Sequence, residues 1–170
     1  MNETKVLSSV IKTSYTKPDI LRRLRLYRSF LEHKFYKKGK KTLDQFLADA
    51  SATSDDHEVI VGWGSEFHRN FTKETAYDIL ESVNSGLKTV PTLSLYLPFD
   101  PKGADVVKLG TWFRTNVDKV ILLDIHSEPG LIGGMAFAWK GYYRDYSLRH
   151  YLMRKKKDID EMFSRYAKNQ

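Results

Sequence analysis

The sequence predicts an α+β fold, in which a bundle of short α-helices precedes a smaller domain of mixed strands and helices. Two observations predict this fold. Apolar residues recur every three or four positions through the first half of the chain, which is the period of an amphipathic helix. From Leu87 onward, alternating and continuous apolar runs appear, and these are the patterns of strands. We therefore expect a helical bundle at residues 1–88 and a βαβββα domain at residues 89–170.

The composition fits one globular domain or two small ones. The 170 residues are 41% hydrophobic and 29% charged, which argues against a disordered chain. The absence of cysteine excludes disulfide scaffolds, zinc ribbons, iron–sulfur clusters and thiol nucleophiles. No apolar run reaches the ~20 residues of a membrane span, and no hydrophobic signal core follows Met1. We expect a soluble chain that keeps its N-terminus.

The first two helices of the bundle are expected within residues 6–39. Apolar residues at positions 6, 7, 10 and 11 form a one-sided stripe. Thr16 with Asp19 resembles a capping arrangement, and Pro18 is tolerated in a first helical turn, where an N–H has no partner. The amphipathic helix that follows should end near Gly39, because glycine commonly terminates helices.

Three more helices are expected before residue 88. Thr42 and Gln45 form a capping box that opens a short helix. Apolar residues from 59 to 71 fall at helical spacing, although Gly62 and Gly64 weaken a helix there. Thr72 should cap a further helix that ends at residues 84–86.

The second half should hold strands around one helix. Residues 91–97 alternate in polarity, which places Leu93, Leu95 and Leu97 on one face of a strand. A helix should open at residues 100–101, and the apolar run 120–125 predicts a strand covered on both faces, so that a right-handed βαβ unit results. Residues 133–146 predict a hairpin, and Ser147 should cap one long C-terminal helix.

Charge is distributed unevenly along the chain, whose formal net charge is +7. Residues 17–41 hold ten basic and two acidic side chains, and residues 140–157 hold seven basic and one acidic. Residues 51–139 instead hold seven basic and twelve acidic side chains. The basic segments suggest an acidic partner such as nucleic acid, an anionic membrane surface or a negatively charged protein, and solvated helix faces are the plain alternative.

Motifs of catalysis and metal binding are missing from the sequence. The five histidines show no HExxH spacing, and no phosphate-binding Gly-rich loop is present. The segment Gly62-Trp63-Gly64-Ser65 lacks the spacing of a nucleophile elbow, and the acids at residues 55–58 suit the first turn of a helix. We expect no catalytic residue, no cofactor and no metal site.

The densest pattern lies between residues 128 and 147. Glu128-Pro129-Gly130-Leu131-Ile132-Gly133-Gly134 precedes the hairpin, and Asp145-Tyr146-Ser147 follows it. Two adjacent glycines at the entrance of a strand indicate a positive φ or a close backbone approach. Leu131 and Ile132 are expected to fill the space between sheet and helix.

This pattern resembles the C-terminal signature of the delta subunit of F-type ATP synthases, called the oligomycin-sensitivity-conferring protein in mitochondria. The family motif reads Asp-Pro-Ser-Leu-Ile-Gly-Gly, then a hairpin, then Asp-Gly-Ser. Glu128, Gly130 and Tyr146 depart from it here. The residues that match are Leu131, Ile132, Gly133, Gly134, Asp145 and Ser147. The resemblance is specific over residues 90–155 and architectural over residues 1–88.

The resemblance implies a non-catalytic stator subunit in the peripheral stalk of a proton-translocating ATP synthase. Such a subunit links the N-terminal helix of an alpha subunit in the catalytic head to the b subunits of the stalk and resists rotational torque. It implies a peripheral protein at the cytoplasmic face of a bacterial inner or plasma membrane, rather than a mitochondrial or plastid one.

Two sets of residues are candidates for these contacts. The candidates for the alpha-subunit groove are Val6, Val10, Ile11, Ile79 and Val83. These residues could instead belong to the ordinary core of the bundle. The candidates for the stalk contact are Arg149, Arg154, Lys155, Lys156 and Lys157. These side chains could instead be solvated and contact no partner.

A small basic RNA-binding protein is the alternative function. Aromatic stacking together with cationic backbone contacts is a common way to hold single strands. No sheet-borne aromatic motif or Gly-x-x-Gly clamp supports it, so nucleic acid is not the expected partner. The residues that suggest it are Tyr142, Tyr143, Tyr146 and Tyr151, interleaved with Arg144, Arg149 and Arg154.

Overall fold

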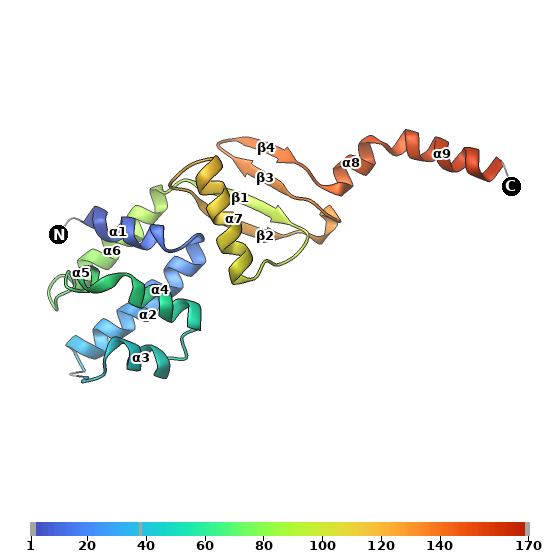
Figure 1. Cartoon of the computed structure of the whole chain (residues 1–170). Helices are drawn as coiled ribbons and strands as arrows, with labels where there is room; N and C mark the ends of the chain where they lie inside the picture. The colour runs from blue at the N-terminus through green and yellow to red at the C-terminus, as the bar shows by residue number, and fades with distance from the viewer. Residues whose placement is uncertain (1–2, 38, 169–170) are drawn as a thin grey trace. The chain divides into compact units, whose positions relative to one another are not determined.

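The computed structural model describes residues 3–37 and 39–168 (Figure 1). These residues form a mixed α/β protein with nine α-helices, one short 3₁₀ helix and one four-stranded sheet, so the predicted mixture of helices and strands is confirmed. None of these helices combines the length and the apolar character needed to cross a bilayer.

The chain divides into two compact units. The first comprises Met1–Pro91 and Gly103–Leu122, and the second comprises Thr92–Lys102 and Leu123–Gln170. The helix between the first two strands therefore groups with the helical unit, whereas the sequence division assigned it to residues 89–170. The boundary at residue 88 stays a prediction about folding domains.

The first unit is helical. Its helices are α1 (Glu3–Lys12), α2 (Lys17–Phe35), α3 (Leu43–Asp49), α4 (Ser54–Gly62), α5 (Gly64–His68), α6 (Ala76–Thr89) and α7 (Gly103–Asn116).

Local capping fixes where several of these helices begin. The Thr16 hydroxyl accepts a hydrogen bond from the Asp19 N–H, and Thr42 and Gln45 form a reciprocal capping box. Both predicted caps are confirmed. Helix α2 ends at Phe35, close to the expected end near Gly39.

The segment around Gly62 and Gly64 contains two helices instead of one. Helix α4 ends at Gly62, and α5 begins at Gly64, whose φ of +83° interrupts the helical path. Glycine adopts this left-handed conformation readily because it has no Cβ. The continuous helix expected over residues 59–71 is therefore wrong.

Both predicted limits of α6 are also wrong. Thr72 and Thr75 form a turn with each other, and the helix begins at Ala76 and runs through Gly86 to Thr89. Gly86 stays helical because it lies against α1. A Cβ there would lie 2.6 Å from Leu7 Cδ2, so the glycine allows the two helices to approach closely.

An aromatic cluster occupies the core of the first unit around Tyr27, which is fully buried. Its ring lies within 6.0 Å of the rings of Phe30, Trp63, Phe67, His68 and Phe71. The Tyr27 hydroxyl and His68 Nδ1 are 2.9 Å apart, so this polar end has a hydrogen-bond partner. The pair connects α2 with α5.

A buried ionic network joins α2, α4 and the turn after α1. The Arg23 guanidinium donates to Asp56 Oδ1 over 2.9 Å, to the Ser14 hydroxyl over 2.6 Å and to Asp55. Arg22 donates to both Asp56 oxygens over 2.8 Å. Burial opposes the charged carboxylate, but the hydrogen bonds from the two arginines outweigh it and hold the pKa of Asp56 below its ordinary value.

The second unit contains one sheet whose strand order is β2-β1-β3-β4. Strands β3 and β4 form the predicted hairpin, with Phe137 opposite Arg144 and Ala138 opposite Tyr143. Strand β1 pairs antiparallel with β3. The strands are β1 (Thr92–Leu97), β2 (Leu122–Ser127), β3 (Ala136–Trp139) and β4 (Tyr142–Asp145).

Burial of the strands follows the sequence only in part. Leu93, Leu95 and Leu97 are buried on one face of β1, as predicted. Strand β2 is buried only at Leu122 and Leu123, and its remaining residues are partly or fully exposed. Both faces are therefore covered only at Ile121, Leu122 and Leu123, because successive strand residues point to opposite faces, and the prediction fails from Asp124 onward.

The C-terminal helical segment is broken. Ser147 caps α8 (Leu148–Arg154) as predicted, but Lys155 separates it from α9 (Lys156–Lys168). The expected single long helix is therefore wrong. Apolar side chains are exposed along both helices, among them Tyr151, Met162 and Phe163.

We predict that Arg23→Met lowers the free energy of unfolding by about 1–3 kcal/mol, because the buried Asp56 carboxylate loses one of its two arginine partners in α2 and keeps only Arg22. Urea denaturation monitored by circular dichroism measures this loss. Arg25→Met, at an exposed position of the same helix, is the control and should change stability by less than about 0.5 kcal/mol. Equal losses in the two variants would contradict a special role for the buried pair.

His68 should make stability depend on pH. Burial, with a contribution from Lys34, lowers the pKa of His68. As pH falls below about 6.5, the unfolded state takes up a proton that the folded state resists, so the free energy of unfolding should decrease. Urea midpoints at pH 7.5 and 5.5 should therefore differ more for the wild type than for His68→Gln. The same difference in both proteins would refute this assignment.

Candidate functional site

The two halves of the signature meet in one junction of the second unit. The Tyr146 N–H donates to the Met135 carbonyl, and the Leu148 N–H donates to the Gly133 carbonyl, each over 2.9 Å. Residues that lie on either side of the hairpin in sequence are thus joined by backbone hydrogen bonds. The 3₁₀ helix η1 (Pro129–Leu131) leads into this junction and buries Leu131.

Gly134 allows the closest approach in this junction. Its φ is +75°, and a Cβ at this position would lie 2.3 Å from the Tyr146 carbonyl oxygen. A side chain is excluded for both reasons. The second glycine of the signature is therefore required by the backbone itself.

Asp145 and Ser147 fix the beginning of α8. The Ser147 N–H donates to Asp145 Oδ1 over 2.8 Å, and the Ser147 hydroxyl accepts from the His150 N–H over 3.1 Å. The hydrogen bonds from Ser147 lower the pKa of Asp145. Tyr146 stands where the motif that the sequence resembles has glycine, and its φ is not positive. Its ring stacks on Phe137 at 6.1 Å, so this turn does not need a glycine.

Ile132 does not fill the space between sheet and helix, contrary to the sequence-based expectation. It is 62% exposed and has a φ of +68°, which is strained for a β-branched residue. Strain of this kind concentrates at functional positions. Ile132 thus presents an apolar side chain at the surface of the junction.

The five residues predicted to line the alpha-subunit groove are buried in the core of the first unit. Side chains from α1 and α6 pack together there, and only Ile11 also reaches a surface groove. The periodicity identified apolar faces correctly, but it could not show that each face covers the other. The residues concerned are Val6, Val10, Ile11, Ile79 and Val83.

The first surface groove is mostly apolar and has a volume of about 590 Å³. Leu7 and Ile11 of α1, Val90 after α6 and Val120 after α7 provide its apolar lining. Arg114 supports it by donating to the Ser14 carbonyl over 2.6 Å and stacking on Tyr15 at 4.3 Å. Burial lowers the pKa of Arg114.

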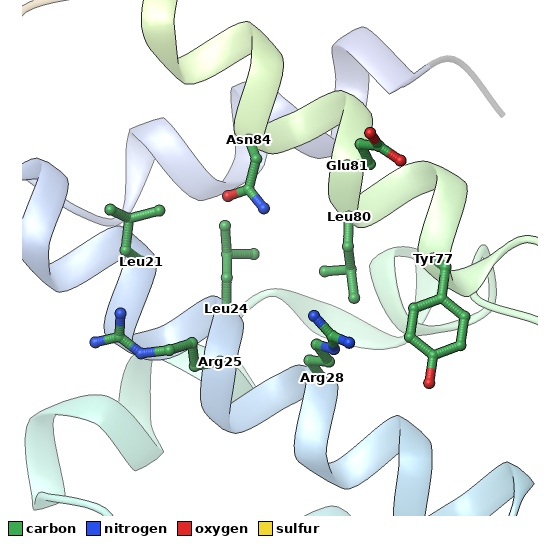
Figure 2. A pocket seen from close by; sticks show the side chains of 8 residues that line it. All are labelled: Leu21, Leu24, Arg25, Arg28, Tyr77, Leu80, Glu81 and Asn84. Atoms are coloured by element: carbon green, nitrogen blue, oxygen red, sulfur yellow. The ribbon is translucent and has the colours of Figure 1, made fainter.

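A second groove of about 510 Å³ lies between α2 and α6 (Figure 2). Helix α2 contributes Leu21, Leu24, Arg25 and Arg28. Helix α6 contributes Tyr77, Leu80, Glu81 and Asn84.

Both walls of this second groove have the spacing i, i+3, i+4, i+7, so each is one face of a helix over two turns. Arg28 closes one end, because its guanidinium lies 5.2 Å from the Tyr77 ring centroid and donates to Glu32 over 2.9 Å. This groove could not be predicted from the sequence, because its residues are contributed by two helices far apart in the chain.

The residues predicted to contact the stalk lie on α8, on α9 and at Lys155 between them, and all are exposed. Lys155 forms an ion pair with Asp158 over 2.9 Å, which raises the pKa of Lys155. The exposed apolar residues described above lie in the same two helices. The stalk set, which stays a prediction, is Arg149, Arg154, Lys155, Lys156 and Lys157.

The aromatic and basic residues that suggest RNA binding lie on different surfaces of the second unit. Residues alternate between the two faces along β4, so Tyr142 and Arg144 lie on one face and Tyr143 lies on the other. Tyr143 shares its face with Asp145, a carboxylate that would repel phosphate. Tyr151 lies outside the sheet, on α8.

Side chains that could bind a metal ion or act in catalysis are dispersed over the described residues. Over residues 3–37 and 39–168, no group of three or more His, Cys, Asp or Glu side chains could hold a metal ion. The acids at positions 55 and 56 belong to the ionic network of the core. A pocket of about 510 Å³ in the second unit is lined by Asp145, Ser147 and His150. Ser147 is buried, and its hydroxyl caps helix α8 by accepting a hydrogen bond from the His150 N–H.

Comparisons with known proteins do not assign the chain to a family. No protein-family model matches the chain, and no curated protein matches it either.

We predict that Gly134→Ala destabilises the protein by about 3 kcal/mol or more, because it combines a positive φ with a backbone clash. Gly141→Ala is the matched control. Gly141 has a φ of +81°, and a Cβ added to it would meet no atom within 4 Å, so only the conformational cost of about 1 kcal/mol applies. Thermal unfolding compares the two variants, and equal shifts would contradict the close approach.

Proposed function

We propose that the protein is a peripheral-stalk subunit of an F-type ATP synthase, of the delta type. The observation that carries this proposal is the junction between Leu-Ile-Gly-Gly and Asp-x-Ser. The two halves are separate stretches of sequence, and the hydrogen bonds of Gly133 and Met135 connect them in space. This contact supports the interpretation of both halves as one structural signature.

The finer arrangement belongs to the same proposal. A helical bundle binds the catalytic head, and a βαβββα domain carrying the signature binds the stalk. The apolar groove at Leu7, Ile11, Val90 and Val120 is the site for an amphipathic helix of an alpha subunit. Helix-in-groove recognition uses apolar anchors at helical spacing, and this groove offers an apolar lining made by α1 and by the segments that follow α6 and α7.

The stalk contact lies on α8 and α9 and includes Ile132 of the junction. Exposed apolar side chains give such a contact its area, and Arg149 and the cluster at residues 154–157 pair with acidic stalk helices. The protein works by slow dissociation from both partners, because a joint under torque has to hold without performing a reaction. It acts at the cytoplasmic face of a bacterial membrane.

The test is reconstitution with purified alpha and b subunits. The full chain should bind both, and Val120→Glu should weaken binding of the alpha subunit at least tenfold, which is about 1.4 kcal/mol. Val107→Glu on α7 is the matched control, since Val107 is 45% exposed and Val120 is 46% exposed. Val107 does not line the apolar groove.

The salt dependence of alpha-subunit binding distinguishes this proposal from RNA binding, whereas the ionic stalk contact is itself sensitive to salt. An apolar helix–groove contact should hardly change between about 50 and 200 mM salt, whereas phosphate contacts weaken steeply with ionic strength. Failure to bind alpha or b subunits, together with salt-sensitive retention of single-stranded RNA, would overturn the stator function.

A further inference from the structure

The apolar groove of the first unit is bordered by charge of one sign. Of the described residues that line it, three are basic and none is acidic. The basic residues are Lys12, Arg114 and Lys119. The groove between α2 and α6 differs, because Glu81 lines it together with two arginines. The apolar groove therefore combines an apolar floor with a cationic border.

Arg114 brings a partly buried positive charge to this border without a carboxylate beside it. Its guanidinium donates to the Ser14 carbonyl over 2.6 Å and to the Lys12 and Ile121 carbonyls over 3.3 Å each. These bonds use three of its five N–H groups, so two remain for another acceptor. Over residues 3–37 and 39–168, neither Arg114 nor the two lysines of the border form an ion pair. Because water and salt screen a partly buried cation less than an exposed one, an anion placed here is held more strongly.

The rest of the lining indicates which kind of anion fits. No described lining residue is aromatic, so the groove offers no ring on which the bases of a single-stranded nucleic acid could stack. The residues that α1 contributes have the spacing i, i+3, i+4, i+7, i+8 and extend for about 12 Å, the length of two helical turns. They are Thr4, Leu7, Ser8, Ile11 and Lys12. A second helix that lies along α1 can cover this edge with its own apolar stripe and hold carboxylates at the border.

We propose that the helix bound in the apolar groove is acidic, and that it places carboxylates against Lys12, Arg114 and Lys119 beside its apolar stripe. This inference rests on the proposed stator function, in which the helix belongs to an alpha subunit. It adds the charge by which the groove distinguishes one amphipathic helix from another, because like charges across an interface exclude a wrong partner. Two or three such contacts remain far less sensitive to salt than the many phosphate contacts of a nucleic acid.

Designed peptides test the charge preference of the full chain. Each peptide is an amphipathic helix of about 18 residues, long enough to be helical, with one shared apolar stripe. Glutamate flanks the stripe in the first peptide, glutamine in the second and lysine in the third. Isothermal titration calorimetry should show that the glutamate peptide binds at least about tenfold more tightly than the lysine peptide, with the glutamine peptide between them. Equal affinities would overturn the inference.

A charge reversal locates this preference on the chain. Lys119→Glu should reduce the preference for the glutamate peptide over the lysine peptide about fivefold, because one ion pair is lost and one like-charge contact is created. Lys108→Glu is the matched control, since Lys108 is also exposed and its reversal changes the net charge equally. Lys108 does not line the apolar groove. The same reduction in both variants would assign the preference to net charge and overturn the inference.

Binding of the alpha subunit separates this inference from the stator function. If the alpha subunit binds and Val120→Glu weakens it, but the three peptides bind equally, the stator function stands and the acidic helix is overturned. If the chain discriminates among the peptides but binds no alpha subunit, the selectivity of the groove is supported and the stator function is overturned.

Discussion

The helical unit depends on the buried ion pair between Arg23 and Asp56. The buried Asp56 carboxylate is held by both Arg23 and Arg22, because an unpaired buried charge costs several kcal/mol. Arg23 also donates to Asp55, to the Ser14 hydroxyl and to the Thr13 carbonyl, and so connects α2 with α4 and with the turn after α1. Such a network holds three segments in one geometry, because each remaining donor needs its partner.

This network also decides which face of α2 is available to other molecules. Arg22 and Arg23 are committed to carboxylates inside the unit, so the ten basic residues of segment 17–41 are not one solvated face. Arg25 and Arg28 lie beside the groove against α6 instead. The aromatic cluster around Tyr27 stabilises the same helix from its apolar side. Helix α2 is therefore both the centre of the core and one wall of a surface groove.

Features set by neighbouring residues could be predicted from the sequence. The caps at Thr16, Thr42 and Ser147 depend on a hydroxyl and an N–H three residues later, so spacing alone identifies them. Features set by distant residues could not be predicted. Gly86 continues a helix because Leu7 packs against it, although 79 positions separate the two in sequence. Glycine near the end of a helical pattern normally indicates its terminus.

In the candidate sites, too, features that depend on residues distant in sequence could not be predicted. Periodicity identifies an apolar face, but the partner that covers it lies elsewhere in the chain, as Val6 and Val83 of the core illustrate. The LIGG pattern predicted a close backbone approach, and Gly134 makes it. The sequence could not indicate that Ile132, next to the buried Leu131, is exposed. Its direction follows from a backbone conformation that a β-branched residue rarely adopts.

The outer strands β2 and β4 also bear on how the protein avoids aggregation. An uncovered strand edge offers unpaired N–H and C=O groups to any other chain, and proteins protect such edges with charges and with short strands. Strand β4 has only four residues and includes Arg144 and Asp145, whereas β2 presents Asp124 and His126. Growth of the sheet by addition of foreign strands is therefore disfavoured on both sides.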